Sequence, residues 1–198
     1  LCGYRMVDGW QRCRRVAFYI QFSRPIHHWV TKGFGFVTDS TRMVTGPDTK
    51  VCLDFEPSTQ PLLIKTALSP LSEANARENM LTDNPGWDME KVINHTEEAW
   101  QKELENITVE GTDKQKTIFY TALYHAYIQP NTFNDCNGQY MKANYEPGVV
   151  EKGHTYYTTL SLWDTFRAAH PLYTLLKPER VGDFVESMLR QYDSYGFL

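Results

Sequence analysis

The pattern of apolar residues changes once along this chain of 198 residues, near residue 70. Before that point, short runs rich in aromatic and β-branched residues alternate with turns rich in glycine and proline, which is typical of antiparallel strands in a β-sandwich. After it, apolar residues recur at helical intervals. Strands followed only by helices exclude the βαβ alternation of a doubly wound sheet. We therefore predict an α+β chain, with a β-domain followed by a helical region.

Three runs before residue 70 are predicted strands. They are "RRVAFYIQFSRPI" at 14–26, "VCLDF" at 51–55 and "PLLIKTALS" at 61–69, separated by "KGFGF", "GPDTK" and "EPSTQP". Seventy residues are too few for a complete large sandwich. Residues 1–70 are accordingly predicted to be its last strands.

Helix start and stop signals punctuate the second part of the chain. Ser72 is a candidate N-cap, Pro130 ends a helical pattern, and Pro178 stands where a helix start tolerates a missing N–H. A polar, glycine-containing loop is expected over about 131–155. The predicted helices cover 72–84, 88–107, 112–130, 157–176 and 179–195.

Composition excludes several partners. The formal net charge is −4, from 20 basic and 24 acidic residues, without the clustered cations that binding to a phosphate backbone requires, so we expect no nucleic acid. No run of about 18 apolar residues exists, so no membrane span is expected. The four cysteines lack the spacing of a zinc site and are expected to be free and buried, with a Cys2–Cys13 pair across a hairpin as the alternative.

The most unusual polar feature is Trp163-Asp164, with Arg167 close behind, in a stretch that reads as an apolar helix. A carboxylate beside a large aromatic loses hydration unless a partner compensates. In a helix, Arg167 is placed to form an ion pair with Asp164 or to stack on Trp163, which would make the group a structural cluster. Alternatively the indole faces a sugar ring and the carboxylate accepts its hydroxyls.

Two further features are weaker. His125 lies near the apolar stripe of the 112–130 helix, where a histidine is more often a hydrogen-bonded core residue than a ligand-binding one. The segment "NTFNDCNGQY" has the oxygen-rich composition of a calcium loop but lacks its spacing and terminal glutamate, so an ordinary turn is expected. No nucleophile-and-base motif occurs in the chain.

Several long stretches resemble family 92 glycoside hydrolases, the calcium-dependent exo-α-mannosidases. They are "GYRMVDGW", "RVAFYIQFSRPI", "WDMEKVINHTEEAWQKEL", "QKTIFYTALYHAYIQPNTFND" and "YTTLSLWDTFRAAHPLYTLLKPERVGDFVESML". The resemblance implies an N-terminal β-sandwich, a helical linker and an (α/α)6 barrel. On this basis we expect an internal fragment: the end of the sandwich at 1–70, the linker at 71–112 and the first barrel helices at 113–198.

The resemblance also implies a function for the complete protein. It implies hydrolysis of terminal α-linked mannose in glycans, including N-glycans, with inversion at the anomeric carbon, by a secreted enzyme in an extracellular or periplasmic location. Trp163 and Asp164 are expected to bind the terminal mannose, with weaker expectations for Arg167 and His125. The catalytic acid and base and the calcium ligands are expected downstream of this chain, so no catalytic residue or metal ligand is predicted within it.

Two alternatives stay open at this point. One is another (α/α)6 glycosidase, acting on glucosides, and the other is a noncatalytic carbohydrate-binding or scaffold protein that uses the sandwich alone.

Overall fold

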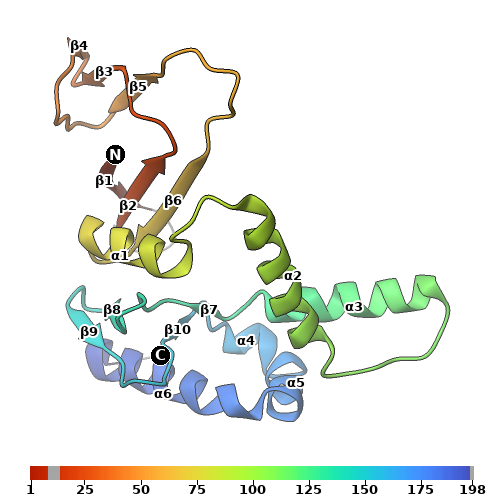
Figure 1. Cartoon of the computed structure of the whole chain (residues 1–198). Helices are drawn as coiled ribbons and strands as arrows, with labels where there is room; N and C mark the ends of the chain where they lie inside the picture. The colour runs from red at the N-terminus through yellow and green to blue at the C-terminus, as the bar shows by residue number, and fades with distance from the viewer. Residues whose placement is uncertain (9–13, 197–198) are drawn as a thin grey trace.

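The computed structural model describes residues 1–8 and 14–196, and begins with two three-stranded antiparallel sheets (Figure 1). One sheet has the order β1-β2-β6 and the other β4-β3-β5. The three predicted strands are confirmed as β2, β5 and β6. The strands are β1 (Cys2–Val7), β2 (Arg14–Phe22), β3 (His28–Gly33), β4 (Phe36–Asp39), β5 (Lys50–Asp54) and β6 (Ile64–Ser69).

The hairpin between β3 and β4 falls in the predicted turn "KGFGF". Phe34 and Gly35 have φ angles of 50° and 82°, the left-handed conformation that a type I′ hairpin turn requires at both central positions. In the other sheet, β2 is the central strand, and its Ala17 is fully buried. Helix α1 (Glu73–Asp83) packs on this sheet through Ala76 and Met80.

The helix boundaries confirm the local signals in the sequence. Ser72 Oγ accepts a hydrogen bond of 3.1 Å from the backbone N–H of Asn75 at the start of α1. Thr112 forms a capping box with Gln115 at the start of α3 (Asp113–Tyr127). Pro178 is the first residue of the last helix. The other long helices are α2 (Met89–Leu104) and α6 (Pro178–Tyr195).

The single predicted helix over 157–176 is wrong. The segment contains β10 (Tyr157–Thr158), one turn of helix α4 (Leu162–Thr165) and α5 (Ala169–Leu176). A continuous helix would lose a backbone hydrogen bond at Pro171, which has no N–H to donate to the carbonyl of Arg167. In the observed structure Pro171 lies in the first turn of α5, where that N–H is not needed.

The predicted loop over 131–155 is also more ordered than expected. It contains β7 (Asn131–Thr132), which pairs with β10, and the hairpin of β8 (Gln139–Met141) and β9 (Pro147–Val149). The rings of Tyr140 and Tyr156 stack at 4.0 Å between centroids, with Val150 in the same buried cluster. Aromatic residues in a polar stretch thus build a small core.

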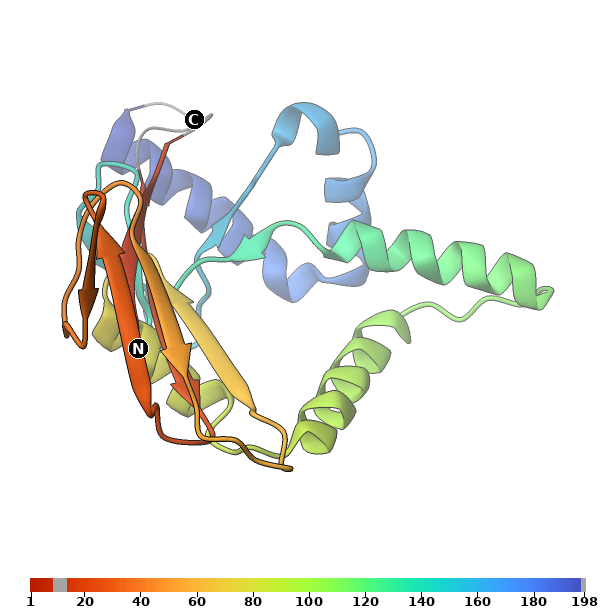
Figure 2. The same ribbon diagram turned by 90° about the horizontal axis from the view of Figure 1, so that it is seen from above.

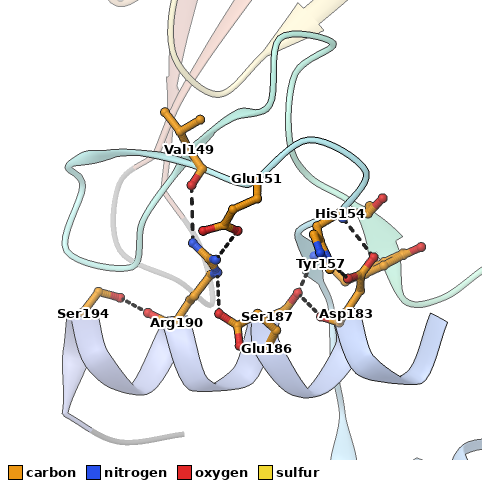
Figure 3. A network of polar contacts seen from close by, with 10 residues as sticks. Val149, Glu151, His154, Tyr157, Asp183, Glu186, Ser187, Arg190 and Ser194 are labelled. Carbon is orange, nitrogen blue, oxygen red and sulfur yellow. Dashed lines mark hydrogen bonds and ion pairs between the residues drawn. The ribbon is translucent and has the colours of Figure 1, made fainter. Parts of the chain in front are cut away.

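Helix α6 holds the segment after β9 in place through two polar groups (Figure 3). Asp183 binds the ring of His154 at 2.7 Å and the backbone N–H of Thr155 at 2.9 Å. Arg190 donates to Glu151 at 2.7 Å and to the carbonyl of Val149 at 3.3 Å. These hydrogen bonds fix the position of the segment that leads into β10 and α4.

The expectation of buried thiols is wrong for three cysteines. Cys2, Cys52 and Cys136 are free and exposed, while Cys13 lies outside the described residues. Within residues 1–8 and 14–196, no helix is both long and apolar enough to cross a membrane. The assignments of 1–70 to a sandwich, 71–112 to a linker and 113–198 to a barrel stay predictions.

Candidate functional site

Trp163 and Asp164 lie together on the exposed turn α4. Trp163 is the most exposed large apolar side chain of the described residues, at 89% of its full surface. Asp164 Oδ2 accepts a hydrogen bond of 2.6 Å from Ser161 Oγ. Asp164 lies in the first turn of α4, where an acidic residue is favourable. Consecutive residues of one exposed turn therefore carry an indole and a carboxylate.

Arg167 does not take the position expected for an ion pair or for stacking on Trp163. Its guanidinium lies over the ring of Phe166, 5.3 Å from the centroid, while Asp164 is paired with Ser161. The break in the helix after α4 is the reason, because the spacing rules for ion pairs apply only within one continuous helix. Trp163 and Asp164 thus share one exposed turn, while Arg167 contacts Phe166.

His125 is exposed on α3, and its ring contacts that of Tyr124 at 5.7 Å. The expectation of a hydrogen-bonded core histidine is therefore wrong. Figure 2 shows that the N-terminal end of α3 projects away from the other elements, whereas Tyr124, next to His125 near the other end, packs against Trp100 of α2. Among the described residues, no hydrogen bond, ion pair or ring contact joins His125 to α4.

A groove of about 430 Å³ lies between Phe166 and the helices α5 and α6. Its wall includes His170, whose ring nitrogens are both buried and have no hydrogen-bond partner among the described residues. Burial lowers the pKa of His170, because the charged imidazolium loses hydration. The remaining lining residues are Pro171, Tyr173, Thr174, Val181, Phe184, Val185 and Met188.

Ser161, which donates to Asp164, was not among the site residues predicted from the sequence. Ser161 and Asp164 form the pattern Ser-x-x-Asp that marks a helix start, and this signal was available in the sequence. No comparable signal singled out His170. Its burial between α5 and α6 depends on the packing of those helices.

The resemblance implies calcium, whose ligands are expected outside this chain. Within residues 1–8 and 14–196, no group of three or more histidine, cysteine, aspartate or glutamate side chains is arranged to hold a metal ion. The expectation of ligands downstream of this chain stays a prediction.

A match to a family model identifies the family of this chain. The family model described as the glycosyl hydrolase family 92 catalytic domain matches residues 75–198, which include α1 to α6 almost entirely. The chain belongs to glycosyl hydrolase family 92. A search of curated protein sequences gave no match.

Solved structures of family 92 enzymes resemble the whole chain, the strands included. The GH92 alpha-mannosidase BT3965 from Bacteroides thetaiotaomicron is 32% identical, with a TM-score of 0.88, over 97% of this chain and 27% of its own. The GH92 inverting mannosidase BT2199 from the same organism is 29% identical, with a TM-score of 0.84, over 93% of this chain and 26% of its own. BT3965 has also been solved in complex with mannoimidazole.

This chain therefore spans about a quarter of the length of these family 92 relatives. The expectation of a glycoside hydrolase of family 92 is confirmed by the family match and these structures. The expected roles of Trp163, Asp164, Arg167 and His125 in sugar binding stay predictions.

Proposed function

We propose that the whole protein is an inverting exo-α-mannosidase that removes terminal α-linked mannose from glycans. The single observation that carries this proposal is the 32% identity to the alpha-mannosidase BT3965 over 97% of this chain, with a TM-score of 0.88. The mannoimidazole complex of BT3965 and the inverting activity in the name of BT2199 support the substrate and the stereochemistry.

Within this chain, the proposed contribution is sugar binding by Trp163 and Asp164. The exposed indole offers a flat apolar surface for the C–H face of a pyranose ring. Because Ser161 occupies Asp164 Oδ2, the other carboxylate oxygen is oriented and open to a sugar hydroxyl. An aromatic surface beside an oriented charged acceptor is the chemistry that holds a sugar in one pose.

The proton-transfer groups of an inverting glycosidase are two carboxyl groups about 6.5–9.5 Å apart, which leaves room for the attacking water. We propose that these groups and the calcium ligands belong to the part of the protein outside this chain. We also propose an extracellular or periplasmic location and a barrel built on α3 to α6. Both follow from the family resemblance.

The test is the anomeric configuration of the first product. The whole protein is incubated with an aryl α-mannoside, and proton NMR follows the anomeric signals before mutarotation. We expect β-mannose to appear first, and an aryl α-glucoside to be a much poorer substrate. Initial α-mannose would contradict inversion, preference for the glucoside would favour another (α/α)6 glycosidase, and binding without turnover would favour a noncatalytic protein.

A further inference from the structure

The connection between β10 and α4 contains a backbone conformation that is unusual for its residue type. Thr159 has a φ of 61°. Positive φ is uncommon for β-branched residues and persists only where the surrounding structure holds it. Two residues later the chain reaches Ser161, the N-cap of the turn that carries Trp163 and Asp164. The unusual conformation therefore lies at the base of the proposed sugar-binding turn.

Asn131 holds Thr159 in this conformation. The Thr159 hydroxyl lies within hydrogen-bond distance of two acceptors, Asn131 Oδ1 at 2.8 Å and the Thr158 carbonyl at 2.5 Å, and the backbone N–H of Asn131 donates to Thr159 Oγ1 at 3.3 Å. Asn131 also lies opposite Thr158 in the pairing of β7 with β10. The side chain and backbone of one residue thus both bind the turn.

Asn131 also binds the end of α3. Its Nδ2 donates a hydrogen bond of 3.1 Å to the carbonyl of Ile128, directly after the last residue of that helix. Both polar atoms of the Asn131 side-chain amide are therefore hydrogen-bonded, the oxygen to the Thr159 hydroxyl and the nitrogen to the Ile128 carbonyl. Through this bridge the position of α4 is coupled to α3, which precedes β7 in the chain (Figure 1).

We propose that Asn131 and Thr159 are positioning residues that set the orientation of Trp163 and Asp164, an inference that rests on the proposed function. The left-handed Thr159 redirects the chain from the extended path of β10 into the α4 turn. An extended residue at this position would displace the α4 turn and, with it, the indole and the carboxylate. Neither Asn131 nor Thr159 needs to touch the sugar for this role.

The kinetic test compares three substitutions in the whole protein. Thr159→Gly tolerates positive φ but loses the hydroxyl, and Asn131→Asp keeps the acceptor but loses the donor to Ile128. For both we expect KM for an aryl α-mannoside to rise about tenfold while kcat changes less than about twofold, because binding groups are displaced. Thr159→Ser keeps the hydroxyl and should restore KM to within about twofold of wild type.

Tyr145→Gly is the matched control, because Tyr145 also has a positive φ, of 67°, in the turn between β8 and β9. We expect it to leave KM unchanged. An unchanged KM in both Thr159→Gly and Asn131→Asp would overturn the proposal. So would an equal rise of KM in Tyr145→Gly, because a general effect of altered turns would then explain the result.

A second measurement separates this inference from the proposed function. The protein is labelled with fluorotryptophan, and the fluorine NMR signal of Trp163 is assigned by its loss in Trp163→Phe. We expect Thr159→Gly and Asn131→Asp to shift this signal and Tyr145→Gly to leave it in place. If wild type hydrolyses no α-mannoside but the signal shifts, the proposed function fails and the positioning role stands. If the signal shifts in neither variant, the positioning role is overturned whatever the activity.

Discussion

Ser69 Oγ donates a hydrogen bond of 2.7 Å to Asp135 Oδ2, across 66 positions of sequence. Both residues are almost completely buried, and Asn79 Nδ2 donates to the other carboxylate oxygen of Asp135 at 2.7 Å. The end of β6, helix α1 and the segment between β7 and β8 therefore meet at one carboxylate. This contact joins the sheet part of the chain to the helical part.

Replacement of Asp135 by alanine should remove the hydrogen bonds that connect these segments. The hydroxyl of Ser69 and the amide of Asn79 would lose their acceptor in a buried place, so we expect the free energy of unfolding to fall by about 2–4 kcal/mol. Urea denaturation measures the change. Asp193→Ala, at an exposed position on α6, is the control. A loss for Asp135→Ala no larger than that of the control would contradict this role of Asp135.

Lys65 connects β6 to the segment that follows α1 through a second set of hydrogen bonds. Its amino group is buried and donates to the carbonyls of Asn84, Pro85 and Gly86 at 2.9, 3.3 and 3.0 Å. Lys65→Met keeps the apolar stem but leaves three carbonyls without a donor, so we expect a loss of about 2–3 kcal/mol. Faster amide hydrogen exchange around residues 84–88 should accompany it. The exposed Lys91→Met should change neither quantity.

His154 should make stability depend on pH. Its hydrogen bond to Asp183, and then the charge of that carboxylate, raise the pKa of His154 above 6.5. A raised pKa in the folded state means that the added stability is complete below about pH 6.5 and is lost as the pH rises through the folded value. The difference in unfolding free energy between wild type and His154→Gln should therefore shrink with rising pH. A difference that does not change with pH would contradict this assignment.

His170 should show the opposite sign. Burial lowers the pKa of its imidazole below 6.5, so the neutral ring suits the folded protein and stability is lost as the pH falls through the folded value. NMR titration of the ring should give a midpoint below 6.5. A midpoint at or above the ordinary value would show that the ring has a charged or polar partner in solution.

Asp164→Asn in the whole protein tests the proposed sugar contact. Asparagine keeps the size of the side chain but loses the charge and replaces one acceptor by a donor. We expect kcat/KM for an α-mannoside to fall by about 30- to 1000-fold, equivalent to about 2–4 kcal/mol of transition-state binding. Because asparagine can still accept from Ser161, stability should change by less than about 1 kcal/mol.

Two further substitutions should be measured beside Asp164→Asn, namely Trp163→Ala and Arg167→Ala. Trp163→Ala should cause a loss of similar order through the missing indole surface. Arg167→Ala should have a smaller effect, because the guanidinium lies on Phe166 rather than on Asp164. A nearly normal kcat/KM for Asp164→Asn would show that the Trp-Asp pair only shapes the turn.

Much of the secondary structure could be predicted because its signals are local. Ser72, Thr112 and Pro178 act on the backbone within one turn, so they mark helix starts in any tertiary context. The prediction of one continuous helix over 157–176 was wrong because two local signals oppose it. Those signals are the Ser161–Asp164 capping pattern and Pro171, which requires a helix start nearby.

The sequence by itself determined β2, β5 and β6, most of the helix boundaries and, through long specific stretches, the family, but it did not predict that β7 to β10 lie between the helices. Tertiary structure decided which distant groups meet: Ser69 with Asp135, Asn131 with Thr159, and Asp183 with Thr155. It also decided that Arg167 turns to Phe166 and that His125 is exposed. The physical reason is the distance along the sequence over which each interaction acts. Capping and backbone sterics act over three or four residues, whereas burial and strand pairing depend on segments that only folding brings together.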